Sequence, residues 1–172
     1  MRKRSMKPNA QLALEEAIKQ RLVVVGPGTT QDIVDETARV IGVPDAGELA
    51  RYLLIANGFQ RGRFSTFGVA GSRVPQSNRG SAELPWMSGK CRRLCAQVRT
   101  AAGKPIWSPK SLLQMTAIGD DGLGGTFVWI TGDPAGTTTV LRLDPETWEP
   151  MQTIAESYAD FLLWILAAEA VV

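Results

Sequence analysis

The C-terminal half of the sequence constrains the fold most, because three short apolar segments follow one another at short intervals. They are SLLQMTAIG (111–119), TFVWITG (126–132) and TTTVLRLD (137–144). The last two are rich in β-branched or aromatic residues, and the gaps are rich in Gly, Asp and Pro, the residues of tight turns. This pattern predicts an antiparallel meander.

The N-terminal part of the chain has the apolar spacing of helices. Asn9 is a suitable N-cap for a first helix, which carries Leu14, Ile18 and Leu22 on one face. A second helix is expected between Thr30 and Gly42, with inner residues Ile33, Thr37, Val40 and Ile41. A third follows Pro44 and ends at Asn57-Gly58, with inner residues Leu49, Tyr52, Leu53 and Ala56.

The chain ends in a further amphipathic helix. Thr153 and Glu156 match a T-x-x-E capping box at its start. One apolar face then contains Ile154, Tyr158, Phe161, Leu162, Ile165 and Leu166. The elements together predict an α+β fold, in which a central antiparallel sheet (a meander) is flanked by N-terminal helices and a C-terminal helix.

A length of 172 residues suits a single domain spanning 1–172, with a long connection rich in Gly, Ser, Pro and Arg at about 57–110. Periodicity is absent from 57 to about 90, which favours a long loop with one short strand at FSTFGVA (64–70). The segment 90–100 fits either a helix or a strand.

The absence of histidine excludes most catalytic arrangements. It removes Ser-His-Asp and Cys-His nucleophiles, His-ligated zinc and the commonest general base. The two cysteines, Cys91 and Cys95, lie one helical turn apart and indicate reduced thiols. We therefore predict no catalytic, cofactor-binding or metal-binding residues. An enzyme would have to use carboxylates, and the candidates would be Asp120, Asp121 and Asp133.

The stretch GDDGLGGTFVWITGDPAG (119–136) invites a ligand-binding interpretation, but its spacing fits none. It matches neither phosphate-loop pattern, and it lacks the spacing of a calcium loop. Asp and Gly are the residues that tight turns use. The stretch therefore predicts two turns around one strand.

Charge is strongly segregated along the chain. Residues 51–110 contain eleven basic side chains and one acid, Glu83, whereas 111–172 contain nine acids and one base, Arg142. The asymmetry indicates either a binding surface or the neutralisation of one segment by the other. If it is a surface, the candidate partner-binding residues are Arg61, Arg63, Arg92, Arg93, Asp120, Asp121 and Asp133.

The basic stretch also raises the alternative of a nucleic-acid-binding module, because Phe59, Phe64 and Phe67 lie among its arginines. No groove-reading motif accompanies it, so a protein partner is the stronger expectation. The five tryptophans are expected to be packed or half-packed in the core; they are Trp86, Trp107, Trp129, Trp148 and Trp164.

The N-terminus is basic, but charged residues interrupt the region where the apolar part of a signal peptide would lie. The longest apolar run, FLLWILAA (161–168), is too short to span a bilayer. A cytoplasmic location without membrane association is expected.

Three segments resemble the SUKH superfamily, which includes fungal cell-wall synthesis regulators and many bacterial immunity proteins. They are IGVPDAGELARYLLIANGF (41–59), IGDDGLGGTFVWI (118–130) and ESYADFLLWI (156–165). The most specific features are Asn57-Gly58, the Gly/Asp turn and the Ser157-Tyr158…Phe161-Leu162 pattern. The family's Leu-Pro is Val43-Pro44 here, its Ser-Phe is Ser157-Tyr158, and roughly 60–117 has no counterpart.

The resemblance implies an α+β fold and a non-catalytic role. A member of this kind would be an immunity protein that binds a cognate toxin, for example a nuclease, and blocks it. A regulatory scaffold that binds an endogenous partner is the alternative within the same fold. The identity of the partner and the oligomeric state are left open.

Overall fold

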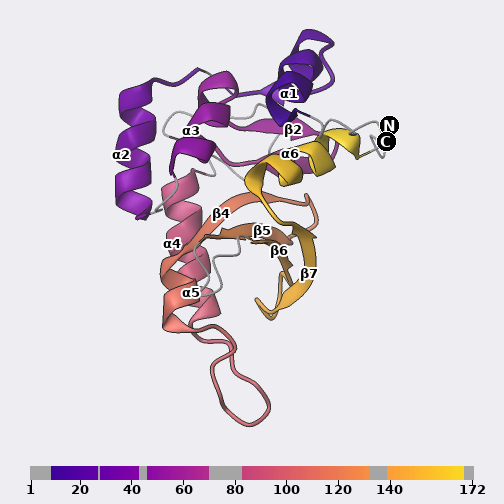
Figure 1. The fold of residues 1–172 in the computed structure, drawn as a ribbon. Coiled ribbons are helices and arrows are strands. Elements are labelled where there is room, and N and C mark those ends of the chain that lie inside the picture. Colours follow the sequence, from indigo (N-terminus) through magenta and orange to yellow (C-terminus); the bar gives the residue numbers. More distant parts are fainter. Residues whose placement is uncertain (1–8, 27, 43–45, 70–82, 132–138, 169–172) are drawn as a thin grey trace, which may run out of the picture.

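The structure, a computed structural model, describes residues 9–26, 28–42, 46–69, 83–131 and 139–168. Within these ranges the chain forms an α+β fold of six helices and a seven-stranded antiparallel sheet (Figure 1). The strands lie in the sheet in the order in which they occur in the sequence, from β1 to β7. The predicted fold class and meander are confirmed.

The strands are β1 (Val24–Val25), β2 (Phe59–Arg61), β3 (Phe64–Thr66), β4 (Met115–Asp120), β5 (Thr126–Ile130), β6 (Thr139–Leu143) and β7 (Pro150–Ala155). The helices are α1 (Ala10–Lys19), α2 (Gln31–Ile41), α3 (Ala46–Ile55), α4 (Leu84–Cys95), α5 (Pro109–Leu113) and α6 (Tyr158–Ala167). The three predicted apolar segments thus contain β4, β5 and β6, although the start of the first forms part of α5.

The core lies on both faces of the two central strands, β4 and β5, in which every residue is buried. On one face, Phe127 and Trp129 of β5 pack against α6, with ring centres 5.2 Å from Phe161 and 5.7 Å from Tyr158 respectively. On the other, α4 packs along β4, and the Ser88 hydroxyl accepts a hydrogen bond from the Ala117 N–H at 3.0 Å. Helices therefore cover both sides of the sheet centre.

The C-terminal helix begins later than the capping-box prediction, which was wrong. Thr153 and Ile154 belong to β7. The N-cap is Ser157, whose hydroxyl accepts from the Asp160 N–H at 3.0 Å and donates to the Asp160 carboxylate at 2.9 Å. An S-x-x-D sequence thus caps the helix, because β7 uses the residues before it to pair with β6.

Two of the N-terminal helices also differ from their predicted forms. In α2 the buried face contains Val34, Thr37 and Ile41, whereas Ile33 and Val40 are 38% and 59% exposed. Helix α1 ends at Lys19 and does not reach Leu22. The N–H of Leu22 donates to Ala17 O and that of Arg21 to Ile18 O, which is the Schellman pattern of a helix end.

The connection at 57–110 is more regular than predicted. It contains the β2–β3 hairpin and α4, followed by the start of α5. The short strand expected at 64–70 is confirmed as β3. The segment 90–100, which fitted either a helix or a strand, begins as the last part of α4. Residues 70–82, the centre of the expected loop, lie outside the described residues.

Candidate functional site

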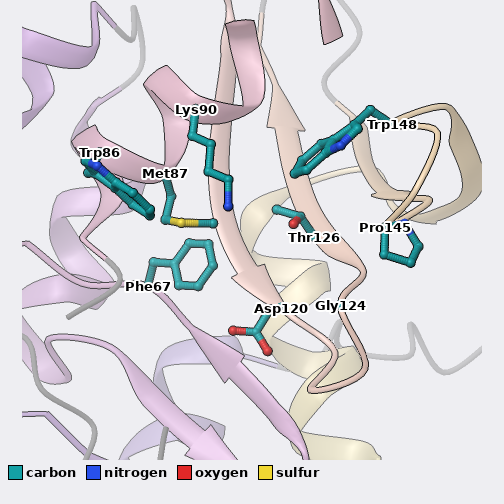
Figure 2. A pocket seen from close by; sticks show the side chains of 9 residues that line it. All are labelled: Phe67, Trp86, Met87, Lys90, Asp120, Gly124, Thr126, Pro145 and Trp148. Carbon is teal, nitrogen blue, oxygen red and sulfur yellow. The ribbon is translucent and has the colours of Figure 1, made fainter. Parts of the chain in front are cut away.

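A pocket with a volume of about 540 Å³ opens beside α4, at the ends of the central strands (Figure 2). Pockets of this size commonly accept small molecules or side chains of a partner. We call it the Trp86–Trp148 pocket, after the two tryptophans that lie on opposite sides of it. Its lining residues are Phe67, Trp86, Met87, Lys90, Asp120, Gly124, Thr126, Pro145 and Trp148.

Helix α4 supplies one wall. Trp86 and Lys90 are four residues apart and therefore lie on the same side of the helix. The Lys90 ammonium is 5.5 Å from the centre of the Trp86 ring, and the Trp86 side chain is 60% exposed. The start of α4 is held against the chain that follows β3, because the Leu84 N–H donates a hydrogen bond of 2.8 Å to Gly68 O. The wall therefore presents an exposed indole on an anchored helix.

Asp120, at the end of β4, supplies an acceptor at the opposite side of the pocket. Its carboxylate accepts one hydrogen bond from the Ser65 hydroxyl and one from the Gly122 N–H, both 2.8 Å long. An ionised carboxylate has about four acceptor sites, so part of its capacity is unused by these bonds. Neither Asp120 nor Lys90 forms an ion pair with another described residue, although both line the pocket.

The third wall comes from the turn between β6 and β7. Trp148 has a φ of +61°, a left-handed conformation that is rare for a bulky residue. Its carbonyl accepts a hydrogen bond from the Trp107 indole at 3.3 Å. Asp144 accepts from the N–H groups of Thr147 and Glu146, and these bonds lower the pKa of Asp144. The turn thus fixes an energetically costly backbone that places Trp148 at the pocket.

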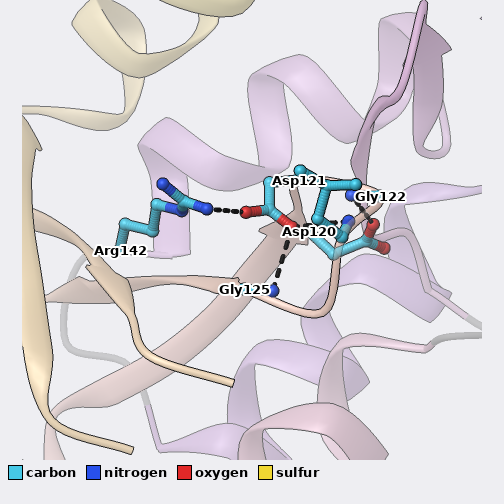
Figure 3. A network of polar contacts seen from close by, with 6 residues as sticks. Asp120, Asp121, Gly122, Gly125 and Arg142 are labelled. Atoms are coloured by element: carbon cyan, nitrogen blue, oxygen red, sulfur yellow. Dashed lines mark hydrogen bonds and ion pairs between the residues drawn. The ribbon is translucent and has the colours of Figure 1, made fainter. Parts of the chain in front are cut away.

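Asp121 lies next to Asp120 but has a different role (Figure 3). Its side chain is 1% exposed and forms an ion pair with Arg142 of β6. It also accepts hydrogen bonds from the N–H groups of Leu123 and Gly125, at 2.8 and 2.9 Å. A Cβ at Gly125 would lie 2.5 Å from Asp121 Oδ2, so a larger residue here would displace the buried carboxylate. The first of the two predicted turns, between β4 and β5, is thus confirmed, and Asp121 stabilises it from within; the second turn lies outside the described residues.

The two neighbouring acidic candidates therefore differ in their accessibility to a partner. Asp121 is buried in an internal ion pair and is not available to a partner, so its prediction as a partner-binding residue was wrong. Asp120 is 8% exposed, and what is accessible lines the pocket. The third acidic candidate, Asp133, lies outside the described residues.

The four arginine candidates do not form one surface. Arg92 donates to Met115 O and Ile41 O, both at 2.9 Å, and so joins α4 to β4 and α2. Arg61 donates to Ala168 O at 3.1 Å and to Leu22 O at 3.4 Å. These two half-buried guanidinium groups stabilise the fold, and their partner-binding role stays a prediction. Arg63 and Arg93 are exposed, and Arg63 lies 5.1 Å over the Phe64 ring.

Among the described residues, the two charged segments do not neutralise each other by direct pairing. In the part of the chain that the structure describes, no ion pair joins 51–110 to 111–172. Asp121 pairs instead with Arg142, the one base of its own segment. Lys90 and Asp120 come from the two different segments and meet across the pocket as unpaired charges.

The tryptophans fit the core-packing prediction only in part. Trp129 and Trp107 are buried, and Trp164 packs against Phe64, Phe127 and Phe161. Trp86 is an exception that the sequence reasoning missed. Its position four residues before Lys90 was the available signal, but it was usable only once 84–95 was known to be a helix.

Comparison with known proteins finds no matching family model and no matching curated protein. Among the described residues, no helix has both the length and the apolar character needed to cross a membrane. In the same residues, no group of three or more Cys, Asp or Glu side chains is placed to coordinate a metal ion.

Proposed function

We propose that this chain is a non-catalytic, cytoplasmic protein-binding module that neutralises a cognate toxin. Two features support the proposal. The three SUKH-like segments imply this role, and the α+β architecture agrees with what they imply. Because a fold alone does not define a function, the geometry of the site must also support this role.

The observation that carries the proposal is the exposed Trp86 at the edge of a pocket. Tryptophan is among the residues most enriched at the energetic centres of protein interfaces, where it packs in a desolvated pocket. At 60% exposure, Trp86 has most of its area available to a partner. Lys90 beside it adds a charge that orients an approaching surface. We propose this pocket as the centre of the interface.

The test is co-expression with toxic proteins encoded next to this chain. The intact protein should restore growth, and Trp86→Ala should abolish or strongly reduce protection. Leu12→Ala is the matched control, because Leu12 on α1 is 61% exposed but does not line the pocket. Persistent toxicity in the presence of the intact protein would contradict the toxin assignment. Recovery of a housekeeping protein from the native cells would indicate a regulatory scaffold instead.

A further inference from the structure

The Trp86–Trp148 pocket has a specific chemical character that narrows what can occupy it. Its walls are aromatic or apolar, since Trp86, Trp148, Phe67 and Met87 surround the central space (Figure 2). Aromatic rings and methionine sulfur both pack favourably against another aromatic ring. The walls therefore favour a flat apolar group over a flexible polar one.

The pocket contains two charged groups of opposite sign, Lys90 and Asp120. Lys90 extends from α4 toward the space above Asp120, and the Thr126 side chain lies beside this path (Figure 2). Lys90 has three N–H donors, and the Asp120 carboxylate has acceptor capacity beyond the bonds from Ser65 and Gly122. One donor group and one acceptor group thus face a common space.

The balance of charge argues against a charged occupant. An arginine or lysine of a partner would pair with Asp120 but meet the like charge of Lys90, and an aspartate or glutamate would pair with Lys90 but meet the like charge of Asp120, so neither sign gains a net attraction in this partly desolvated space. A neutral group that both donates and accepts a hydrogen bond meets neither cost. It also satisfies Lys90 and Asp120 together.

We propose that the occupant is a tyrosine side chain on the surface of the protein partner. The ring packs between the side formed by Trp86, Met87 and Phe67 and the opposite side formed by Trp148, and the phenol hydroxyl donates to Asp120 and accepts from Lys90. A phenol is the neutral aromatic side chain that has both functions on one atom. The assignment to a protein partner rests on the proposed function, whereas the preference of the pocket for a phenol does not.

The experiment is a binding series with short capped peptides, Gly-Ser-X-Ser-Gly, in which X is Tyr, O-methyl-tyrosine, Phe, Arg or Glu. Binding is followed in the full chain by the indole N–H signals in ¹H–¹⁵N NMR spectra, assigned with single Trp→Phe variants. The Tyr peptide should shift the Trp86 and Trp148 signals, with a dissociation constant on the order of millimolar. It should bind about tenfold more tightly than the Phe and O-methyl-tyrosine peptides, because each lacks the donor to Asp120.

Two variants identify the polar contacts. Lys90→Met should reduce the preference for Tyr over Phe several-fold while leaving binding of the Phe peptide nearly unchanged. Lys110→Met, an exposed lysine on α5 that does not line the pocket, should change neither. Asp120→Ala, which removes the acceptor oxygens, should remove most of the preference. If it also unfolds the protein, the Lys90 variant and the O-methyl-tyrosine peptide still test the assignment.

The inference is overturned if the Phe peptide binds as tightly as the Tyr peptide, if the Arg or Glu peptide binds more tightly, or if no peptide shifts the Trp86 and Trp148 signals. These outcomes are separate from the toxin assay. Tyrosine selectivity without protection from any toxin would refute the proposed function alone. Protection that depends on Trp86, without tyrosine selectivity, would refute only the inferred occupant.

Discussion

The Lys90 ammonium group lies 5.5 Å from the ring centre of Trp86. Trp86 precedes Lys90 by one helical turn on α4. Because a cation–π contact at an exposed site contributes about 0.5–1 kcal/mol, Lys90→Met should lower the free energy of unfolding by no more than about 1 kcal/mol. Urea denaturation measures this value. A loss several times larger would mean that Lys90 has a structural role beyond this contact.

Trp86 and Trp129 provide a matched comparison between an exposed and a buried indole. Trp86 is 60% exposed, whereas Trp129 is fully buried against α6. We expect Trp86→Ala to change the free energy of unfolding by less than about 1 kcal/mol, and Trp129→Ala to lower it by about 3–5 kcal/mol. Similar losses in both variants, measured by urea denaturation, would show that Trp86 is part of the core.

Arg142 stabilises the β4–β5 turn through its ion pair with the buried Asp121 carboxylate. Arg142→Met leaves that charge without its cation, so the free energy of unfolding should fall by about 3 kcal/mol. Arg39→Met is the control. The Arg39–Glu36 pair on α2 is exposed, with side chains 73% and 59% accessible, and its loss should leave the free energy of unfolding nearly unchanged. Thermal and urea unfolding measure both variants. If Arg142→Met and Arg39→Met lowered stability equally, the assigned role of Asp121 would be contradicted.

Arg21 occupies the position after α1 that favours glycine, with a φ of +58°. The side chain is exposed, so its replacement removes little packing. Arg21→Gly should therefore stabilise the protein by about 0.5–1 kcal/mol, seen as a rise in Tm of a few degrees. Arg21→Ala retains the strain and should give no comparable gain. A lower Tm for the glycine variant would refute the argument.

Stability should fall at alkaline pH. Burial raises the pKa of Cys91 and of Cys95 to about 12 from an ordinary 9.0, and it raises the pKa of Tyr158 as well. Because the unfolded chain loses these protons at lower pH than the folded one, the stability they contribute is complete below pH 9 and is lost as pH rises toward 12. Urea midpoints from pH 8 to 11 measure the effect. A Cys91→Ala, Cys95→Ala variant should show a shallower decline.

The central strands were predictable from sequence, and the edge strand β7 was not. TFVWI combines β-branched and aromatic residues between turn residues, and it forms β5. PMQTIA is exposed over most of its length, so it lacks the alternation that identifies a half-buried strand. Helix α4 was missed because Pro85, Ser88 and Gly89 have the composition of a loop. Its signal is the spacing of Leu84, Met87, Cys91 and Cys95, all of which are buried.

The site was less predictable than the fold, because its residues come from separate parts of the chain. Charge counting identified Asp120 but equally Asp121, and only the structure separates a pocket carboxylate from one inside an ion pair. Charge counting also selected Arg92, whose guanidinium group donates to backbone carbonyls. A count of charges cannot distinguish these uses, because each depends on which carbonyls and carboxylates the fold brings nearby.

The sequential order of the strands has a consequence for the folding pathway. Short turns connect β2 to β3 and β4 to β5, whereas residues 67–114 lie between the paired strands β3 and β4. Closing that long loop has a larger entropic cost than forming the hairpins, so β3–β4 pairing should be a late step. Phe67, which follows β3, reaches the pocket only through this pairing. The pocket should therefore be completed late in folding, and a ligand that binds it would selectively report the fully assembled sheet.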